Sequence, residues 1–308
     1  MKEGCESFII DLRDNSGGYL DAAINIANEF LPRGRLIVYT EGRASPRNDA
    51  MANGTGTCLN QALVILINEW SASASEIVAG AIQDNDRGTI IGRRSFGKGL
   101  VQNQIPLSDN SALRLTIARY YTPSGRSIQK KYELGKGNEY ELDLLTRFEH
   151  GEFYTADSIK LDNNPRYETR MGRPVFGGGG IMPDIFVPRD TMGSTSYLTN
   201  LINNGILYEF AFQYTDRHRN SISKYKNYRA LLAYLKTQDI VNEVVSFAES
   251  KGIRPRPTLI EISRKRIENL THSYIIRNVF GDEGFYPVFF TYDQTIEKAI
   301  EVINGGNE

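Results

Sequence analysis

The fold of this chain is decided by residues 62–83, which read ALVILINEWSASASEIVAGAIQ. Ala62–Ile67 is a short, continuous apolar run, which is typical of a buried strand in an α/β protein. Glu76–Gln83 follows, and it places Ile77 and Ala81 on one side of a helix. The stretch therefore predicts a strand, a turn that contains three serines, and a helix.

Similar units flank this one. Ser7–Leu12 is predicted as a strand that ends in a glycine-bearing turn at Asp14–Gly18, because glycine and asparagine tolerate the backbone angles of a sharp reversal. Tyr19–Leu31 has helical spacing of its apolar residues and is followed by proline. The polar segment Glu41–Asn60 reads as an irregular surface loop. Further short strands are expected at Leu36–Tyr39, Thr89–Ile91 and Leu113–Tyr120.

The polarity and the apolar periodicity of the sequence change after about residue 121. Lys130–Arg170 is polar and has no clean period, and Ile181–Val187 looks like an edge strand that carries a proline. Helical patterns dominate from Tyr197 to Ile303. The organisation predicted from these patterns is an α/β catalytic core over residues 1–190 and a helical C-terminal region over residues 191–308.

Composition excludes several classes of protein. The 308 residues contain 36 Lys+Arg against 37 Asp+Glu, so no net field attracts a polyanion, and nucleic acid is not expected as a partner. No apolar run approaches the ~20 residues that a membrane-spanning helix needs. Cys5 and Cys58 lack the spacing of a redox or zinc motif, and the sequence leaves open whether they pair.

Three serines in the predicted strand-to-helix turn are candidate nucleophiles, namely Ser71, Ser73 and Ser75. Free backbone N–H groups and the helix dipole at such a position favour a developing oxyanion. Serine is also a preferred helix N-cap, so each of the three has an ordinary structural explanation. Local sequence does not choose among them.

A base for such a serine has to come from elsewhere in the chain. The three histidines, His150, His218 and His272, all lie outside the α/β segment, which disfavours a Ser/His pair. A lysine can take the role when its amine is uncharged. Lys98 is a candidate because Gly97 and Gly99 allow close backbone packing around it, although a lone loop lysine is more often simply solvated.

The same segment contains weaker signals for a phosphate-binding loop and for a metal site. Gly92, Gly97 and Lys98 fit the first part of a phosphate-binding loop, but Gly99 replaces the hydroxyl residue that would hold Mg²⁺. Asp84 and Asp86 could suggest a metal, yet no histidine or cysteine accompanies them. Neither a phosphate site nor a metal site is predicted.

Four motifs, taken together, resemble the C-terminal processing peptidases, also called tail-specific proteases, which form serine peptidase family S41. The resemblance is specific because the order and spacing of the motifs agree as well as their residues, and a fifth motif at residues 180–185 is also similar. The four motifs read DLRDNSGG at 11–18, SASASEI at 71–77, FGKGLVQ at 96–102 and TPSGR at 122–126.

This resemblance implies a Clp-protease/crotonase-like core, endopeptidase action at or near protein C-termini, and no metal or organic cofactor. It makes Ser73 the nucleophile, Lys98 the general base and Gln102 the residue that orients the lysine. The oxyanion donors it implies are the backbone N–H of Ala74 and that of one glycine of the turn, Gly17 or Gly18. Arg13, Glu76 and Asp84 also fall on motif positions, and for these three a structural role is expected.

The family resemblance also implies a domain organisation, a location and partners for the full-length protein. Its members carry a signal or anchor and a peptide-binding PDZ domain ahead of the first motif, so the catalytic core is expected to be incomplete at its N-terminus here. The expected location of a full-length protein is the periplasm or cell envelope, with protein C-termini as partners, and membrane association and homo-oligomerisation are left open. A non-catalytic peptide-binding or assembly module is the alternative, and an acyl-CoA enzyme of the crotonase fold is a third.

Overall fold

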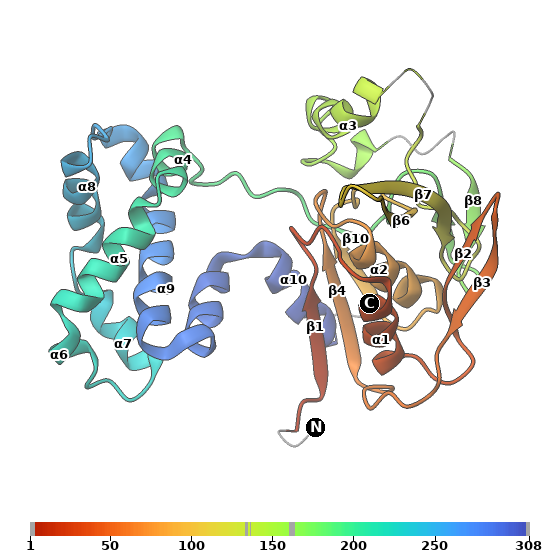
Figure 1. The fold of residues 1–308 in the computed structure, drawn as a ribbon. Coiled ribbons are helices and arrows are strands. Elements are labelled where there is room, and N and C mark those ends of the chain that lie inside the picture. The colour runs from red at the N-terminus through yellow and green to blue at the C-terminus, as the bar shows by residue number, and fades with distance from the viewer. Residues whose placement is uncertain (1–3, 133–134, 136, 160–163, 306–308) are drawn as a thin grey trace. The chain divides into compact units, whose positions relative to one another are not determined.

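The chain divides into two compact units, and each is described by itself (Figure 1). The computed structural model describes residues 4–132, 135, 137–159 and 164–305. Unit 1 contains the chain up to Arg189 and also the helix α10 (Gln294–Ile303), whereas unit 2 is Asp190–Asp293. The expected α/β core and helical C-terminal region are confirmed. The return of α10 to unit 1 was not predicted, because a helical pattern does not say which sheet it covers.

Sheet A forms the centre of unit 1. It is entirely parallel, in the order β1-β4-β5-β10, as expected for strands that are followed by helices. The predicted strands at Ser7–Leu12, Ala62–Ile67 and Thr89–Ile91 are present, while the edge strand predicted at Ile181–Val187 is reduced to two residues. The strands are β1 (Ser7–Asp11), β4 (Ala62–Ile67), β5 (Thr89–Gly92) and β10 (Ile185–Phe186).

Both faces of sheet A are covered, which explains the uninterrupted apolar run of β4. Leu63, Ile65 and Ile67 join the core that also holds α1 (Leu20–Phe30) and α2 (Ala74–Asp84). The alternate residues of β4 pack with Ala299 of α10 on the opposite face. Because side chains alternate along a strand, the six residues of β4 contribute to the apolar cores on both faces of the sheet. The start of α2 follows β4 and therefore lies at the carboxyl edge of the sheet.

Sheet B is antiparallel, in the order β3-β2-β7-β6. The interpretation of Glu41–Asn60 as an irregular loop was wrong in part, because seven of its residues pair with β2 as a polar edge strand that has no apolar alternation to reveal it. β6 was also missed, since its sequence LVQNQIP alternates too weakly. The strands are β2 (Leu36–Gly42), β3 (Ser45–Met51), β6 (Leu100–Pro106) and β7 (Ala112–Tyr121).

The polar segment after residue 130 is more ordered than its sequence indicated. It contains α3 (Gly137–Glu149), the short 3-10 helix η1 (Ala156–Ser158), and the small antiparallel pair β8 (Arg166–Glu168) and β9 (Pro174–Phe176). Cys5 and Cys58 are both unpaired. Among the described residues of the chain, no helix is both long enough and apolar enough to cross a membrane.

Unit 2 is a bundle of helices with its own apolar core. The longest, α9, begins with Pro257 at its first turn, where the missing N–H has no consequence, and is kinked at Gly281, whose φ is 64°. Its helices are α4 (Ser196–Asn203), α5 (Ile206–Arg217), α6 (Arg219–Ile222), α7 (Tyr228–Leu235), α8 (Ile240–Ser250) and α9 (Pro257–Phe289), followed by the 3-10 helix η2 (Phe290–Tyr292).

His272 of α9 is buried in unit 2 and makes its stability depend on pH. Burial, with Lys236 nearby, lowers the pKa of His272 to about 4 from an ordinary 6.5, although a hydrogen bond to Leu235 acts in the opposite direction. The unfolded chain therefore binds a proton between pH 6.5 and 4 that the folded unit does not. We expect the free energy of unfolding of unit 2 to fall by about 3 kcal/mol across that window as the pH decreases.

Urea unfolding followed by circular dichroism at 222 nm, at pH 7 and at pH 4, measures this slope. His272→Leu is expected to flatten it, whereas the matched variant of the less buried His218, His218→Gln, is expected to keep it. An identical slope in wild type and His272→Leu would contradict the assignment.

Candidate active site

Two turns at the carboxyl ends of neighbouring strands are bound to each other. The turn after β1 presents Asp14 and Asn15, and the turn after β4 presents Asn68. Asn68 Oδ1 accepts from the Asp14 N–H at 3.0 Å, and its amide donates back to Asp14 Oδ1 at 2.9 Å. The Ala72 N–H donates to the Asn15 carbonyl at 3.1 Å. These reciprocal bonds fix the glycine turn at 17–18 against the serine turn.

Ser73 is held in a backbone conformation that non-glycine residues rarely adopt. Its φ is 56° and its ψ is −115°, at the junction between β4 and α2. Such a conformation costs on the order of 1–3 kcal/mol and persists only where the surroundings enforce it. The nucleophilic serine of α/β-hydrolases is presented by the same kind of strained strand-to-helix turn. The strain at Ser73 therefore points to a function of that residue.

Hydrogen bonding separates the three serines of the turn. Ser71 Oγ donates to the Leu12 carbonyl at 2.7 Å, and Ser75 Oγ donates to the Asn15 carbonyl at 3.0 Å. Both side chains are buried and serve to hold the two turns together. The Ser73 hydroxyl donates to no carbonyl in the described part of the chain. It is the serine of a capping box with Glu76 at the start of α2, and the residue is only partly buried. Of the three serines, Ser73 alone is not tied to the neighbouring turn through its hydroxyl.

Glu76 joins the serine turn to the loop that carries Lys98. Its Oε2 accepts from the N–H of Ser73 at 2.9 Å and from that of Lys98 at 2.8 Å. Its Oε1 accepts from the Gly97 N–H at 2.7 Å and from the Ser95 hydroxyl at 2.5 Å. Burial raises the pKa of the Glu76 carboxyl, and the four donors oppose that rise. The N–H groups that a phosphate-binding loop would offer are thus committed to a carboxylate.

Tyr120 of β7 forms a second link between the same two segments. Its hydroxyl donates to the Ser73 carbonyl at 3.0 Å and also lies within hydrogen-bond distance of the Lys98 carbonyl. Burial, followed by the charge of Glu76, raises the pKa of Tyr120 well above its usual range, so the phenol stays protonated and remains a donor. Nothing in the residue pattern indicates this role, because Tyr120 occurs in an ordinary strand pattern.

Lys98 reaches a cavity of about 960 Å³ whose wall also includes Gln102. Among the described residues no carboxylate forms an ion pair with Lys98, and no hydrogen bond joins Lys98 Nζ to Ser73 Oγ. The flanking glycines act as expected, because a Cβ on Gly97 would lie 3.1 Å from the Gly180 nitrogen and one on Gly99 would lie 3.0 Å from the nitrogen of Gln129. The structure thus brings Lys98 and Gln102 to one cavity.

A second lysine near the site is already engaged. Lys130 Nζ lies 4.0 Å from the ring centre of Phe96 and 4.2 Å from that of Tyr140, and it pairs with Asp143 at 3.3 Å. These contacts place α3 beside the loop that leads to Lys98. Lys130 is therefore a structural lysine, and Lys98 remains the available one.

The glycine turn lies directly against the start of α2. A Cβ on Gly17 would lie 2.7 Å from the Ala74 nitrogen and 2.8 Å from Ser73 Cβ, and the φ of Gly17 is +95°. The Gly17 N–H is used, because it donates to Asn15 Oδ1 at 2.9 Å. Those of Gly18 and Ala74 donate to no acceptor in the described part of the chain. Ala74 and Gly18 are thus the candidate oxyanion donors, and Gly17 supplies the space.

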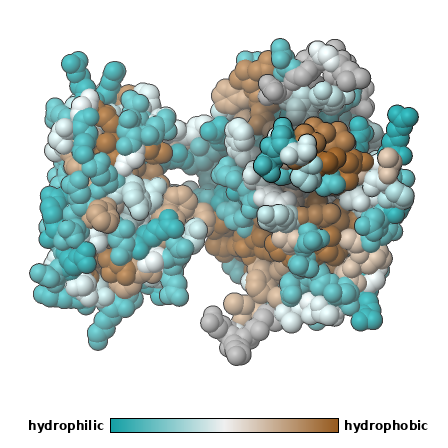
Figure 2. Space-filling view, viewed as in Figure 1, coloured by the Kyte–Doolittle hydropathy of each residue, from teal (hydrophilic) through white to brown (hydrophobic). Residues whose placement is uncertain are grey.

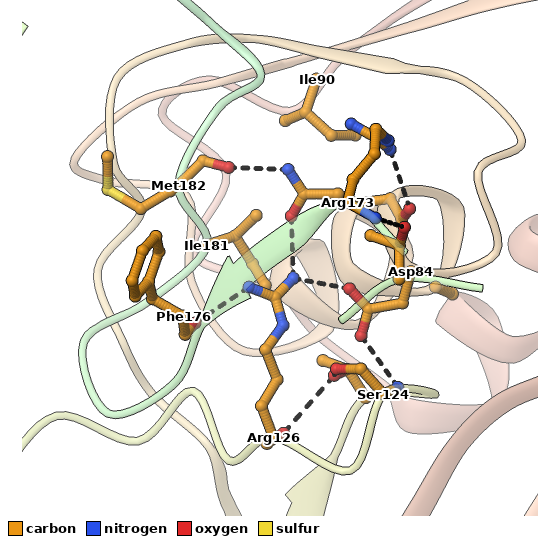
Figure 3. Close-up of polar contacts among 12 residues, drawn as sticks. Asp84, Ile90, Ser124, Arg126, Arg173, Phe176, Ile181 and Met182 are labelled. Atoms are coloured by element: carbon orange, nitrogen blue, oxygen red, sulfur yellow. Dashed lines mark hydrogen bonds and ion pairs between the residues drawn. The ribbon is translucent and has the colours of Figure 1, made fainter. Parts of the chain in front are cut away.

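The other motif residues lie in structural contacts. Asp84, at the end of α2, pairs with Arg126 at 2.7 Å, and both side chains are fully buried (Figure 3). Asp84 also accepts from the Ser124 N–H at 3.1 Å, and Arg126 donates to the Phe176 carbonyl at 2.9 Å. Arg13 forms an ion pair with Asp11 at 2.7 Å. The TPSGR motif therefore anchors the end of α2 that is opposite Ser73.

Removing the Tyr120 hydroxyl tests its positioning role. Tyr120→Phe is expected to lower kcat about 10- to 100-fold with KM little changed, because the lysine loop loses its tie to the serine turn while the substrate contacts remain. Steady-state cleavage of a labelled unstructured polypeptide, the activity expected from the resemblance of the sequence, measures both constants. The control is Tyr39→Phe, a buried tyrosine of neighbouring β2 whose hydroxyl makes no hydrogen bond in the described part. Equal effects of the two substitutions would contradict the role.

Comparison with known proteins shows what this arrangement is similar to. Residues 1–137 match the profile of peptidase family S41, and we call them the S41 segment. The S41 segment holds both turns, Lys98, Gln102 and Tyr120, and residues 197–281 of unit 2 match a family of unknown function.

Relatives of the S41 segment are known from several organisms. A carboxy-terminal-processing protease of Bartonella bacilliformis is 54% identical over 127 residues, and a carboxyl-terminal-processing protease of Synechocystis is 45% identical over 129. These alignments cover 40% and 42% of this chain, and 29% and 30% of the relatives. The chain thus spans less than a third of their length. A solved photosystem II D1 C-terminal processing protease has 41% identity and a TM-score of 0.39, over 42% of this chain and 33% of that one.

Proposed function

We propose that this chain is the catalytic part of a serine-type peptidase in which Ser73 is the nucleophile and Lys98 the general base. The observation that carries the proposal is the strained backbone of Ser73, whose hydroxyl donates to no carbonyl among the described residues. The match of the S41 segment to a peptidase family supports the same chemistry. The names of the relatives, which are carboxy-terminal-processing proteases, support substrates that are cleaved at or near their C-termini. The periplasm or cell envelope is proposed as the location from the family resemblance of the sequence.

The proposed mechanism is acyl transfer. The deprotonated amine of Lys98 takes the proton of Ser73 Oγ, which attacks the carbonyl carbon of the scissile peptide. The oxyanion that forms is held by the N–H groups of Ala74 and Gly18. The lysine ammonium then gives its proton to the departing amine, and an ester to Ser73 remains. Water hydrolyses this ester, with Lys98 again as the base, and the new carboxylate leaves.

Gln102, in the same cavity wall as Lys98, is proposed to orient the amine. Ser73 Oγ and Lys98 Nζ form no hydrogen bond in the described part, so the proposal requires the lysine side chain to swing toward the serine when substrate fills the cavity. Both backbones donate to Glu76 Oε2, so the serine turn and the lysine loop are neighbours before the side chain moves. For Arg13, Glu76 and Asp84 we propose structural roles.

A non-catalytic peptide-binding module that keeps this fold is the alternative. It is favoured only by the missing contact between Ser73 Oγ and Lys98 Nζ. It gives no reason for a serine with a strained backbone at a helix N-terminus, since strain of this kind is retained where it has a use. A fluorophosphonate probe, which phosphonylates nucleophilic serines, separates the two.

The expected result is one adduct per chain, located at Ser73 by peptide mass spectrometry, and parallel loss of cleavage of an unstructured polypeptide. Ser73→Ala is expected to abolish both while the circular dichroism spectrum is unchanged. Ser75→Ala is the matched control, since that hydroxyl only binds a carbonyl, and it is expected to keep both. Cleavage that survives in Ser73→Ala, or an adduct on another residue, would refute the proposal.

A further inference from the structure

The helix α3 lies beside the lysine loop, residues 93–99, but contributes little apolar surface to unit 1. No described residue of α3 belongs to the apolar core clusters of that unit. Leu142, Leu145 and Phe148 are 52%, 50% and 42% exposed. Figure 2 shows apolar residues at the surface where α3 lies in Figure 1. The attachment of α3 therefore depends on the side chains of its other face.

That other face consists of positions 140, 143 and 147, which have the i, i+3, i+7 spacing of one side of a helix. The ring of Tyr140 meets the ring of Phe96 edge-on, with 6.5 Å between the ring centres. Asp143 pairs with Lys130, whose amine lies over the same two rings. Arg147 is the third residue of this face, and it contacts the backbone of the lysine loop directly.

Arg147 binds two carbonyls of the lysine loop. Its Nη1 donates to the Ser95 carbonyl at 3.0 Å, and its Nη2 donates to the Arg94 carbonyl at 2.8 Å. Its Nε donates to Glu152 Oε1 at 2.8 Å, and Arg94 pairs with the same carboxylate at 2.6 Å. The side chains of Arg147 and Glu152 are both buried. The contact requires arginine, because its planar guanidinium presents several N–H donors in fixed directions.

The same loop segment is bound to the serine turn on its other side. The Ser95 hydroxyl donates to Glu76 Oε1 at 2.5 Å. Glu76 Oε2 accepts from the N–H groups of Ser73 and Lys98. The lysine loop has no regular secondary structure and contains two glycines, so its conformation depends on such outside contacts. Arg147 therefore acts on the candidate catalytic residues through Ser95 and Glu76.

We propose that Arg147 is a positioning residue, which holds the lysine loop in the place from which Lys98 reaches Ser73. The inference rests on the proposed function and adds to it a residue beyond the S41 segment, which ends at residue 137. Arg147 acts only through the loop backbone. Without its guanidinium, two carbonyls lose their donors and the loop shifts. A displacement of about 1 Å at a catalytic group can lower a rate about 100-fold.

The experiment removes the guanidinium in two backgrounds. Arg147→Met is expected to lower kcat for an unstructured polypeptide about 10- to 100-fold and to leave KM within about twofold, because the wall of the cavity is unchanged. In Lys98→Ala the same substitution is expected to lower kcat no further, since the loop then has no amine to position. A loss that came only from a smaller folded fraction would multiply in both backgrounds.

Arg147→Lys is the second variant, and it takes the place of Arg147→Met if that protein does not fold. It keeps the buried positive charge, but an ammonium group cannot hold both carbonyls and the carboxylate in the same geometry. Its kcat is expected to lie between those of wild type and Arg147→Met.

The matched control is Arg87→Met, at the amino edge of sheet A and away from the serine turn. Arg87 is a half-buried arginine that also binds only backbone carbonyls, namely those of Phe30, Cys58 and Gln61. Arg87→Met is expected to lower the thermal unfolding temperature and to keep the kcat of wild type. Stability and catalysis are thus measured separately for two arginines of the same kind.

Hydrogen–deuterium exchange of residues 93–99, followed by mass spectrometry, reports on the lysine loop without any turnover. Exchange is expected to be faster in Arg147→Met and unchanged in Arg87→Met. Equal exchange in wild type and Arg147→Met would overturn the inference, and so would an equal fall of kcat with and without the Lys98 amine. Failure of the proposed function has a different signature. Wild type would then neither cleave the polypeptide nor react with the fluorophosphonate, while exchange of the loop would still rise in Arg147→Met.

Discussion

Lys98→Ala is expected to lower kcat by about 10²–10⁴-fold, the usual contribution of a general base, while the fold is retained. Lys98 lines the same cavity as Gln102. Among the described residues, no carboxylate forms an ion pair with its amine. The loop backbone is held by Glu76 and Tyr120 and does not depend on the side chain of Lys98. Activity and stability should therefore separate.

Steady-state kinetics, with thermal unfolding as the control for folding, measure both quantities. Added ethylamine is expected to restore part of the rate to Lys98→Ala, because a small amine can enter the space that the side chain leaves. Lys131→Ala, an exposed lysine 33 residues further along, is expected to match wild type. A kcat for Lys98→Ala equal to that of wild type would remove the lysine from the mechanism.

Asp84→Ala is expected to lower the free energy of unfolding of unit 1 by about 3–5 kcal/mol. The reason is the charge left behind, because Arg126 would then be fully buried without its carboxylate. Loss of the Asp84–Arg126 ion pair also releases the end of α2 from the TPSGR motif. The rate of cleavage should therefore fall together with the free energy of unfolding. Chemical denaturation followed by fluorescence of Trp70, the single tryptophan of the chain, reports on unit 1 alone.

The control for Asp84 is an exposed pair of the same unit. Asp49 pairs with Arg47 on β3, where the two side chains are 44% and 48% exposed. Asp49→Ala should cost less than about 1 kcal/mol, because water screens that pair. If Asp84→Ala cost no more than Asp49→Ala, the buried pair would not be the anchor that its geometry indicates.

The local sequence pattern predicted the strand and the helix that carry Ser73, but not the other strands and the helix that surround the candidate site. The strand at Ala62–Ile67 and the helix after it follow from an apolar run and a helical period, and both are present. β3 and β6 were not predicted, because an edge strand and a weakly alternating strand are recognised mainly by the strands they pair with. The helix α3 was missed for a similar reason, since its sequence has little apolar periodicity.

The choice among the three serines illustrates the same division. By sequence, Ser71, Ser73 and Ser75 are alike, and only a family resemblance selected the middle one. In the fold, two of the hydroxyls donate to carbonyls of the neighbouring turn, whereas Ser73 has a strained backbone and donates to neither carbonyl. Those carbonyls are about 60 residues away in the chain, so no window of sequence contains the distinction.

By itself, the sequence determined the α/β order of the core, the helical character of the C-terminal region, and the four motifs in which Ser73, Lys98 and Gln102 occur. These follow from side-chain period and from short-range residue patterns. Only the tertiary structure decided that Glu76 and Tyr120 join the serine turn to the lysine loop. Burial and hydrogen bonding between distant segments make those decisions, because they depend on which strands become neighbours in the folded chain.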